Sequence, residues 1–232
     1  RMSLVTIDGV ATECAGLTVW WQLCKKVDCA RFEKAWYAAG LPTSVLQDPP
    51  SAIAVLERTM GQLFSDRRTI VKPVQGKEGS YAVLPKDTDG SNNPLYQTAW
   101  TASIKKVRGR HGSDDVLEIS SSCPTKQADQ LETMFDCNLD TYGSREQSQL
   151  MTGVIRWLSG ARLQQAGKLY FLPPDKVADW RRVEEALKAA SGIQTFEIPA
   201  LPAKSAMKAV LHAITADASD VALELEEEIA GF

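Results

Sequence analysis

The sequence predicts an α+β protein, with an antiparallel sheet of β-hairpins and helices in the N-terminal part and a helix-rich C-terminal part that contains a β-α-β unit. Three observations lead to this class. Short runs of β-branched and aromatic residues alternate with glycine-bearing turns between residues 69 and 120. Apolar residues recur at helical spacing in several other segments. The composition, 44% hydrophobic and 24% charged over 232 residues, is typical of one large globular domain or two small ones.

The chain begins with two segments of strand character, residues 3–7 and 17–23. Successive side chains of a strand point to opposite faces, so Trp20 and Trp21 should lie on different sides of the sheet. Both faces of this strand are therefore expected to be at least partly covered.

Two helices are predicted next. Asp28 is a suitable N-cap for a helix over residues 29–39, which Gly40 would end. A second helix is expected over residues 48–64, because prolines 49 and 50 are tolerated in a first helical turn.

A β region follows these helices, with two hairpins separated by a polar loop over residues 86–94. The predicted strands are residues 69–74, 80–84, 96–107 and 115–120.

The C-terminal part is predicted to be mostly helical, and Ser144 with Gln147 has capping-box spacing. Residues 169–172, a helix and residues 193–198 would form the β-α-β unit, with a right-handed crossover if its strands are adjacent. The predicted helices are residues 124–137, 144–165, 173–190 and 202–229. We expect two closely packed modules, residues 1–122 and 123–232, which could together form one domain.

Charge and cysteine content restrict the classes of function. A net charge of −3 argues against binding of nucleic acid or anionic membrane over the whole surface. No apolar run reaches membrane-spanning length. The five cysteines are an odd number without C-x-x-C spacing, which favours reduced thiols and a soluble protein of the cytoplasm.

No catalytic, cofactor or metal site is predicted. The two histidines, His111 and His212, have no cysteine or histidine at ligand spacing. Cys123 is the best nucleophile candidate, because it precedes a helix N-terminus whose dipole could lower the thiol pKa. A connector between a strand and a helix explains Cys123 equally well.

A basic hairpin is the most specific physical feature of the sequence. Lysine and arginine side chains can neutralise phosphates, and a tryptophan face can stack on bases. An ordinary solvated hairpin, balanced by Asp114 and Asp115, is the alternative interpretation. The candidate residues are Trp100, Lys105, Lys106, Arg108, Arg110 and His111.

The order helix, helix, hairpin also permits a winged-helix-like arrangement. The helix over residues 48–64 would then face a DNA groove with Arg58 and Gln62 exposed, and Lys77 would lie on or near the wing.

A last candidate surface lies near the C-terminus. Val221, Leu225 and Ile229 keep helical spacing through an acidic run, residues 224–228, that is most simply a solvated helix face. Their apolar stripe could pack internally or against a partner helix.

Three short motifs resemble those of a group of prokaryotic and phage-encoded proteins of unknown function. They are Gly40-Leu41-Pro42, Pro49-Pro50-Ser51 and the run from Gly167 to Pro173. The resemblance spans most of the chain, implies a bacterial, archaeal or phage source, and carries no catalytic residue over.

These observations favour a non-catalytic binding or accessory protein that acts through macromolecular contacts in the cytoplasm, which would be that of the host cell if the chain is phage-encoded. A protein partner is expected. The alternatives are a DNA- or RNA-binding module that uses the basic hairpin, and an enzyme with an unrecognised site around Cys123.

Overall fold

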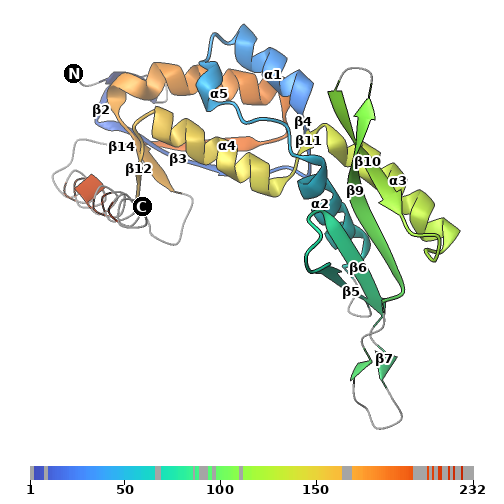
Figure 1. Cartoon of the computed structure of the whole chain (residues 1–232). Helices are drawn as coiled ribbons and strands as arrows, with labels where there is room; N and C mark the ends of the chain where they lie inside the picture. Colours follow the sequence, from blue (N-terminus) through green and yellow to red (C-terminus); the bar gives the residue numbers. More distant parts are fainter. Residues whose placement is uncertain are drawn as a thin grey trace. The chain divides into compact units, whose positions relative to one another are not determined.

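The computed structural model of the chain describes residues 3–7, 10–65, 69–85, 87–88, 94–95, 98–109, 112–163 and 169–200, and seven single positions between 208 and 226. The chain divides into two compact units. Unit 1 consists of residues 1–48 and 142–232, and unit 2 of residues 49–141 (Figure 1). These limits differ from the expected modules 1–122 and 123–232, because a strand near the N-terminus pairs with strands that follow residue 160.

Unit 1 contains a four-stranded antiparallel sheet. Its order is β12 (Ala161–Arg162), β13 (Tyr170–Leu172), β3 (Gly16–Gln22) and β14 (Gln194–Ala200). Both β13 and β14 pair antiparallel with β3, so they run parallel to each other with β3 between them. The expected β-α-β unit is thus present in split form, and its two strands are not adjacent.

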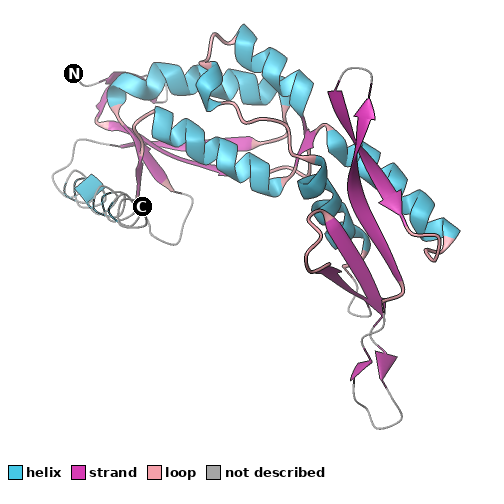
Figure 2. Ribbon diagram, viewed as in Figure 1, coloured by secondary structure: helices cyan, strands magenta, loops and turns pink. Residues whose placement is uncertain are grey.

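Three helices cover one face of this sheet, α1 (Cys29–Ala38), α4 (Ser144–Trp157) and α5 (Val177–Ala190) (Figure 2). Their apolar faces and one face of β3 and β13 form a continuous core. Complete burial of one such large side chain is worth about 1.5–3 kcal/mol. Fully buried members of this core include Leu17, Phe32, Trp36, Leu150, Leu158, Leu172 and Trp180.

The start of α1 agrees with its predicted cap, whereas α4 is capped differently from the prediction. Asp28 Oδ1 accepts a hydrogen bond from the Arg31 backbone N–H at 2.7 Å. At α4, Glu146 Oε2 accepts from the Gly143 N–H at 2.8 Å, and Gln147 is fully buried instead of capping the helix. The Gln147 amide bonds backbone groups of Cys24 and Tyr142, which joins α4 to the chain beyond β3.

Helix α4 is also shorter than predicted. It ends at Trp157 rather than near residue 165, and Ser159 adopts the left-handed conformation with φ 53°. A Cβ atom on Gly160 would lie 2.7 Å from Ile155, so the chain turns tightly there before β12.

Unit 2 contains a second four-stranded antiparallel sheet, which combines both predicted hairpins. Its order is β10 (Gly112–Ile119), β9 (Trp100–Gly109), β6 (Ser80–Pro85) and β5 (Thr69–Pro73). Helices α2 (Ala52–Leu63) and α3 (Thr125–Leu139) share a core with this sheet. Helix α2 begins after Ser51, whose Oγ accepts from the Ala54 N–H at 3.3 Å, and not at the preceding prolines. The buried members of this core are Ala52, Val55, Leu56, Met60, Val83, Trp100, Ala102, Leu131 and Phe135.

The remaining elements are short. Strands β1 (Ser3–Ile7) and β2 (Val10–Cys14) form a hairpin, and β7 (Asp87–Thr88) pairs with β8 (Pro94–Leu95) inside the segment expected to be a loop. Strands β4 (Val27–Asp28) and β11 (Thr141–Tyr142) and the 3₁₀ turns η1 (Thr43–Val45) and η2 (Pro174–Lys176) complete the described chain. No helix among the described residues is long and apolar enough to cross a membrane.

Candidate functional site: the open face of the unit 1 sheet

The face of the unit 1 sheet opposite the helices carries apolar side chains. In β3, Leu17, Val19 and Trp21 belong to the helix-covered core. Because side chains alternate along a strand, Thr18 and Trp20 point to the other face. Cross-strand pairing places further apolar side chains beside them. We call the set Thr18, Trp20, Phe171, Phe196 and Ile198 the open face.

Strand β14 forms the exposed part of the open face. Phe196 stacks on Trp20 with ring centroids 5.5 Å apart, and Ile198 lies opposite Thr18 in the register. Phe196 is 38% exposed and Ile198 is 56% exposed, whereas Val19, Trp21, Tyr170 and Phe171 of the same sheet are buried. Neither they nor Trp20 belong to the hydrophobic core of unit 1. An aromatic pair beside an exposed isoleucine on an edge strand is a typical composition of a protein-binding surface.

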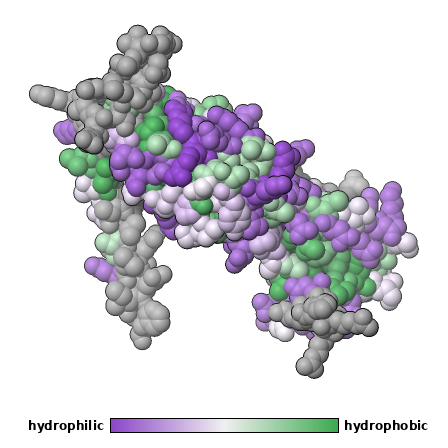
Figure 3. Space-filling view, turned by 90° about the horizontal axis from the view of Figure 1, so that it is seen from above, coloured by the Kyte–Doolittle hydropathy of each residue, from purple (hydrophilic) through white to green (hydrophobic). Residues whose placement is uncertain are grey.

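The opposite side of the same sheet has a different surface. Figure 3 shows the surface from above, where hydrophilic and neutral residues predominate over the helices of unit 1 and separate apolar areas lie among them. Among the described residues of α1, Tyr37 is the exposed large hydrophobic residue.

Glycine at position 16 gives the open face its shape. Gly16 has φ 152°, and a Cβ atom built there would lie 2.2 Å from the Leu172 carbonyl oxygen and 2.6 Å from the Phe171 ring. The Phe171 ring therefore packs directly against the glycine backbone, and its side chain is buried. Any larger residue would displace β13 from β3.

A charged network on the helix side holds β14 in register. Arg181 of α5 donates to Glu197 at 2.6 Å and to Glu184 at 2.8 Å, and the Thr195 hydroxyl donates to Glu184 at 2.8 Å. Burial lowers the pKa of Arg181, but its hydrogen bonds to Glu197 and Glu184 outweigh that effect and the pKa is raised. Since Thr195 and Glu197 are held toward α5, Phe196 must face the other way.

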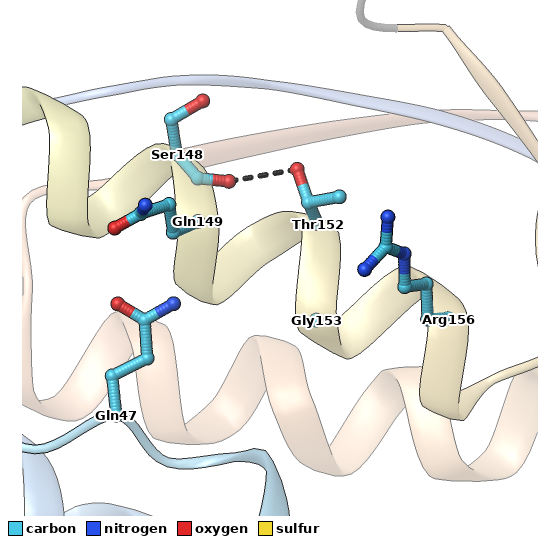
Figure 4. A pocket seen from close by; sticks show the side chains of 6 residues that line it. All are labelled: Gln47, Ser148, Gln149, Thr152, Gly153 and Arg156. Atoms are coloured by element: carbon cyan, nitrogen blue, oxygen red, sulfur yellow. Dashed lines mark hydrogen bonds between the residues drawn. The ribbon is translucent and has the colours of Figure 1, made fainter. Parts of the chain in front are cut away.

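Besides the open face, unit 1 has a polar hollow of about 450 Å³, which lies along α4 (Figure 4). The Thr152 hydroxyl donates to the Ser148 carbonyl at 2.8 Å, so it is already satisfied. Arg156 supplies the positive charge, and no lining residue can act as a general base beside a nucleophile. The hollow can offer hydrogen bonds but no evident chemistry. Its lining residues are Gln47, Ser148, Gln149, Thr152, Gly153 and Arg156.

The structure changes the interpretation of the basic hairpin. Trp100 is 3% exposed and packs edge-on against Phe64 at 5.5 Å, so the prediction that its face is available for base stacking is wrong. Lys105 is exposed and pairs with Glu118 at 3.4 Å. Lys106 and Arg108 lie in β9, although their side chains are outside the described part, and Arg110 and His111 lie outside the described residues.

The predicted groove-facing helix is also engaged within its own unit. Arg58 is half-buried, and its guanidinium donates to the carbonyl oxygens of Asn138 at 2.7 Å and Thr141 at 2.9 Å, next to the C-terminus of α3. The expectation of an exposed Arg58 is therefore wrong. Gln62 is exposed but accepts from the Asn138 amide at 3.2 Å, and Lys77 is exposed in the β5–β6 turn.

The remaining candidates do not assemble a site. The Cys123 thiol lies 3.6 Å from the Pro124 carbonyl, and burial raises its pKa, opposite to the lowering expected from a helix N-terminus. No group of metal-ligating side chains occurs among the residues that the structure describes. Val221, Leu225 and Ile229 lie outside the described residues, as does His212.

Sequence reasoning missed the open face as a site. The only indication of it in the sequence was the pair Trp20 and Trp21, from which we expected both faces of this strand to be at least partly covered. Which face the helices cover depends on pairing with β14, and that pairing joins residues more than 170 positions apart.

Comparison with known proteins identifies a family and no individual relative. No curated protein and no solved structure matches this chain. A family model matches residues 16–232, which begins at the first residue of β3 and spans both compact units. The chain therefore belongs to DUF6744, a family of unknown function.

Proposed function

We propose that this chain is a non-catalytic binding protein, and that a protein partner binds it through the open face. The observation that carries this proposal is the exposure of Phe196 and Ile198 beside Trp20 on one side of β14. Removal of such apolar area from water on binding contributes roughly 25 cal/mol per Å² before the costs of association.

The edge position of β14 favours a partner segment in extended conformation. In the order β12-β13-β3-β14, the outer side of β14 pairs with no strand among the described residues. An added strand would bond to backbone groups of β14, while its alternate apolar side chains would contact Phe196 and Ile198. Pro199 lacks an N–H and would limit how far such pairing extends.

The fixed geometry of β14 also supports binding. The hydrogen bonds of Arg181 and Thr195 hold the strand before any partner arrives. A preformed surface loses little conformational entropy on association, which raises the affinity obtained from a small patch.

Source and location are part of this proposal. The resemblance in the three glycine- and proline-bearing motifs supports a prokaryotic or phage origin. A chain whose five cysteines form no disulfide is suited to action in a reducing cytoplasm, which is the host's if a phage encodes the protein.

Site-specific photo-crosslinking in producing cells tests the proposal. A photoreactive amino acid at Ile198 should give a discrete crosslinked protein, and adding Phe196→Ser should abolish that product. The same photoreactive residue at Tyr37, which is 53% exposed on α1, is the matched control. Equal products from both positions, or a product that survives Phe196→Ser, would contradict a role for the open face.

A further inference from the structure

The polar hollow of unit 1 lies between α4 and the chain that follows η1. Its volume of about 450 Å³ is within the range of small-molecule sites. Figure 4 shows the side chains of Gln47 and Gln149 at one end of the hollow and that of Arg156 at the other, with Gly153 between them on the helix. The hollow therefore offers amide groups at one end and a positive charge at the other.

Both walls of the hollow are held by contacts within unit 1. On one side, Val45 and Leu46 pack against the hydrophobic core, and the Tyr142 hydroxyl donates to the Gln47 carbonyl at 2.6 Å. On the other side, α4 buries Leu150 in the same core. The hollow is thus formed before a ligand arrives, which lowers the entropic cost of binding.

Gly153 keeps the hollow open. A Cβ atom built there would have the Val45 carbonyl oxygen, at 3.9 Å, as its nearest neighbour outside its own helix. Alanine would therefore fit at this position, and glycine inside a helix is destabilising relative to alanine. Packing does not require a glycine here, and its consequence is free space beside the backbone of α4.

The polar side chains around the hollow have bonding capacity to spare. Within the described part of the chain, the amides of Gln47 and Gln149 and the guanidinium of Arg156 make no hydrogen bond or ion pair. A guanidinium binds a carboxylate through two parallel hydrogen bonds. A glutamine amide can donate to and accept from an amide group of a ligand. The matching ligand is a carboxylate that also carries amide groups.

The spacing along α4 sets the length of that ligand. Arg156 follows Gln149 by seven residues, which is about 10 Å of helix at 1.5 Å per residue. Three residues of extended peptide span about the same length. None of the described lining residues is acidic, so none can neutralise an ammonium group. The end of the ligand near Gln149 is therefore an uncharged amide and not a free amino terminus.

We propose that the polar hollow binds the C-terminal end of a peptide chain. The terminal carboxylate lies at Arg156, and the preceding backbone amides lie at Gln149 and Gln47. The hollow belongs to the helical layer of unit 1, whereas the open face is on the other side of the sheet, so this inference does not depend on the proposed function.

NMR titration of the full chain with N-acetyl-triglycine tests the ligand class. The backbone amide signals of Gln149, Gly153 and Arg156 should shift, and that of Tyr37 on α1 should not. The C-terminal carboxamide of the same peptide should bind about tenfold more weakly, because it lacks the charge that Arg156 binds. Triglycine, which has a free ammonium group, should also bind more weakly than the acetylated peptide. Equal or tighter binding of either compound would overturn the proposal.

Two substitutions test the position of the site. Arg156→Gln should weaken the binding of N-acetyl-triglycine about tenfold, whereas Lys188→Gln, which removes the same charge from the exposed surface of α5, should have no effect. Gly153→Leu should fill the hollow and abolish binding. Circular dichroism and thermal unfolding would check that the variants retain the fold. Unchanged binding in Arg156→Gln or in Gly153→Leu would show that the peptide does not bind in the hollow.

Discussion

Individual buried polar groups determine how the elements of unit 1 meet. Gln147 is fully buried and satisfies backbone groups on both Cys24 and Tyr142, which a capping role could not do. The Tyr142 hydroxyl donates to the Gln47 carbonyl at 2.6 Å. An unpaired buried polar group costs about 1–3 kcal/mol, so each of these bonds specifies one arrangement of the chain.

Replacement of Gly16 by alanine should destabilise the protein by about 2–3 kcal/mol. The new Cβ would meet the Leu172 carbonyl and the Phe171 ring, and φ 152° disfavours alanine. Urea unfolding measures the change. Gly61→Ala is the matched control, because a Cβ atom at this position in α2 would have no neighbour within 4 Å, and this change should stabilise by roughly 0.5–1 kcal/mol. Similar effects at both positions would refute the packing described for Gly16.

Tyr142 should make stability fall at alkaline pH. Burial, then the Cys29 thiol, Glu33 and Asp48, raise its pKa from 10.0 to about 12. The folded state thus holds the phenolic proton more tightly than the unfolded state does. This contribution is complete below pH 10 and is lost as the pH rises from 10 to 12.

The Tyr142→Phe variant isolates this effect. Between pH 9 and 11 the wild type should lose about 1 kcal/mol more of its unfolding free energy than the variant does. Urea titrations at several pH values measure the difference. Parallel pH profiles for the two proteins would show that the phenol does not titrate as described.

At the scale of elements, the sequence predicts most helices and strands and both hairpin pairings of unit 2, but not how strands that are distant in sequence pair. Helix α1 and its Asp28 cap are confirmed, because a local hydrogen bond decides them. The end of α4 was missed, since Ser159 takes a left-handed conformation that its residue type does not indicate. The separation of β13 from β14 by β3 depends on contacts that are distant in sequence.

The attachment of β14 to α5 should depend on the Arg181 network. Arg181→Ala leaves the Glu184 carboxylate, which is buried, without its cation and should cost about 2 kcal/mol. Adding Glu184→Gln should recover part of that loss, because the Thr195 hydroxyl can still donate to the amide. Arg182→Ala removes the more exposed pair with Asp179 and should cost less than about 1 kcal/mol.

Thermal unfolding of the four proteins tests this order of stability. A cost for Arg182→Ala equal to that for Arg181→Ala, or no recovery in the double variant, would contradict the assigned role of the network.

The hairpin of β9 and β10 should not supply a nucleic-acid site. Trp100 is buried and Lys105 is paired with Glu118, so the double substitution Lys105→Glu and Arg108→Glu should leave any oligonucleotide affinity unchanged. Fluorescence polarisation with single- and double-stranded oligonucleotides at two salt concentrations measures it. Salt-dependent binding by the wild type that the double variant loses would restore the nucleic-acid hypothesis.

At the scale of the whole molecule, the fold class was predictable and the division into units was not. Residues 49–141 form their own core of α2, α3 and a sheet, which interrupts unit 1 in sequence. Local periodicity cannot show that residues 16–22 belong with residues 170–200. The candidate site could not be predicted from local periodicity for the same reason, because the open face forms only when β14 pairs with β3.

Isothermal titration of the partner captured at Ile198 tests the central claim most directly. Binding through the open face predicts that Ile198→Asp weakens affinity at least tenfold, because a charge must then be buried among apolar groups. Tyr37→Asp on the helical layer should leave the affinity within about twofold of the wild type. If Ile198→Asp binds as tightly as the wild type, the open face is not where this protein meets its partner.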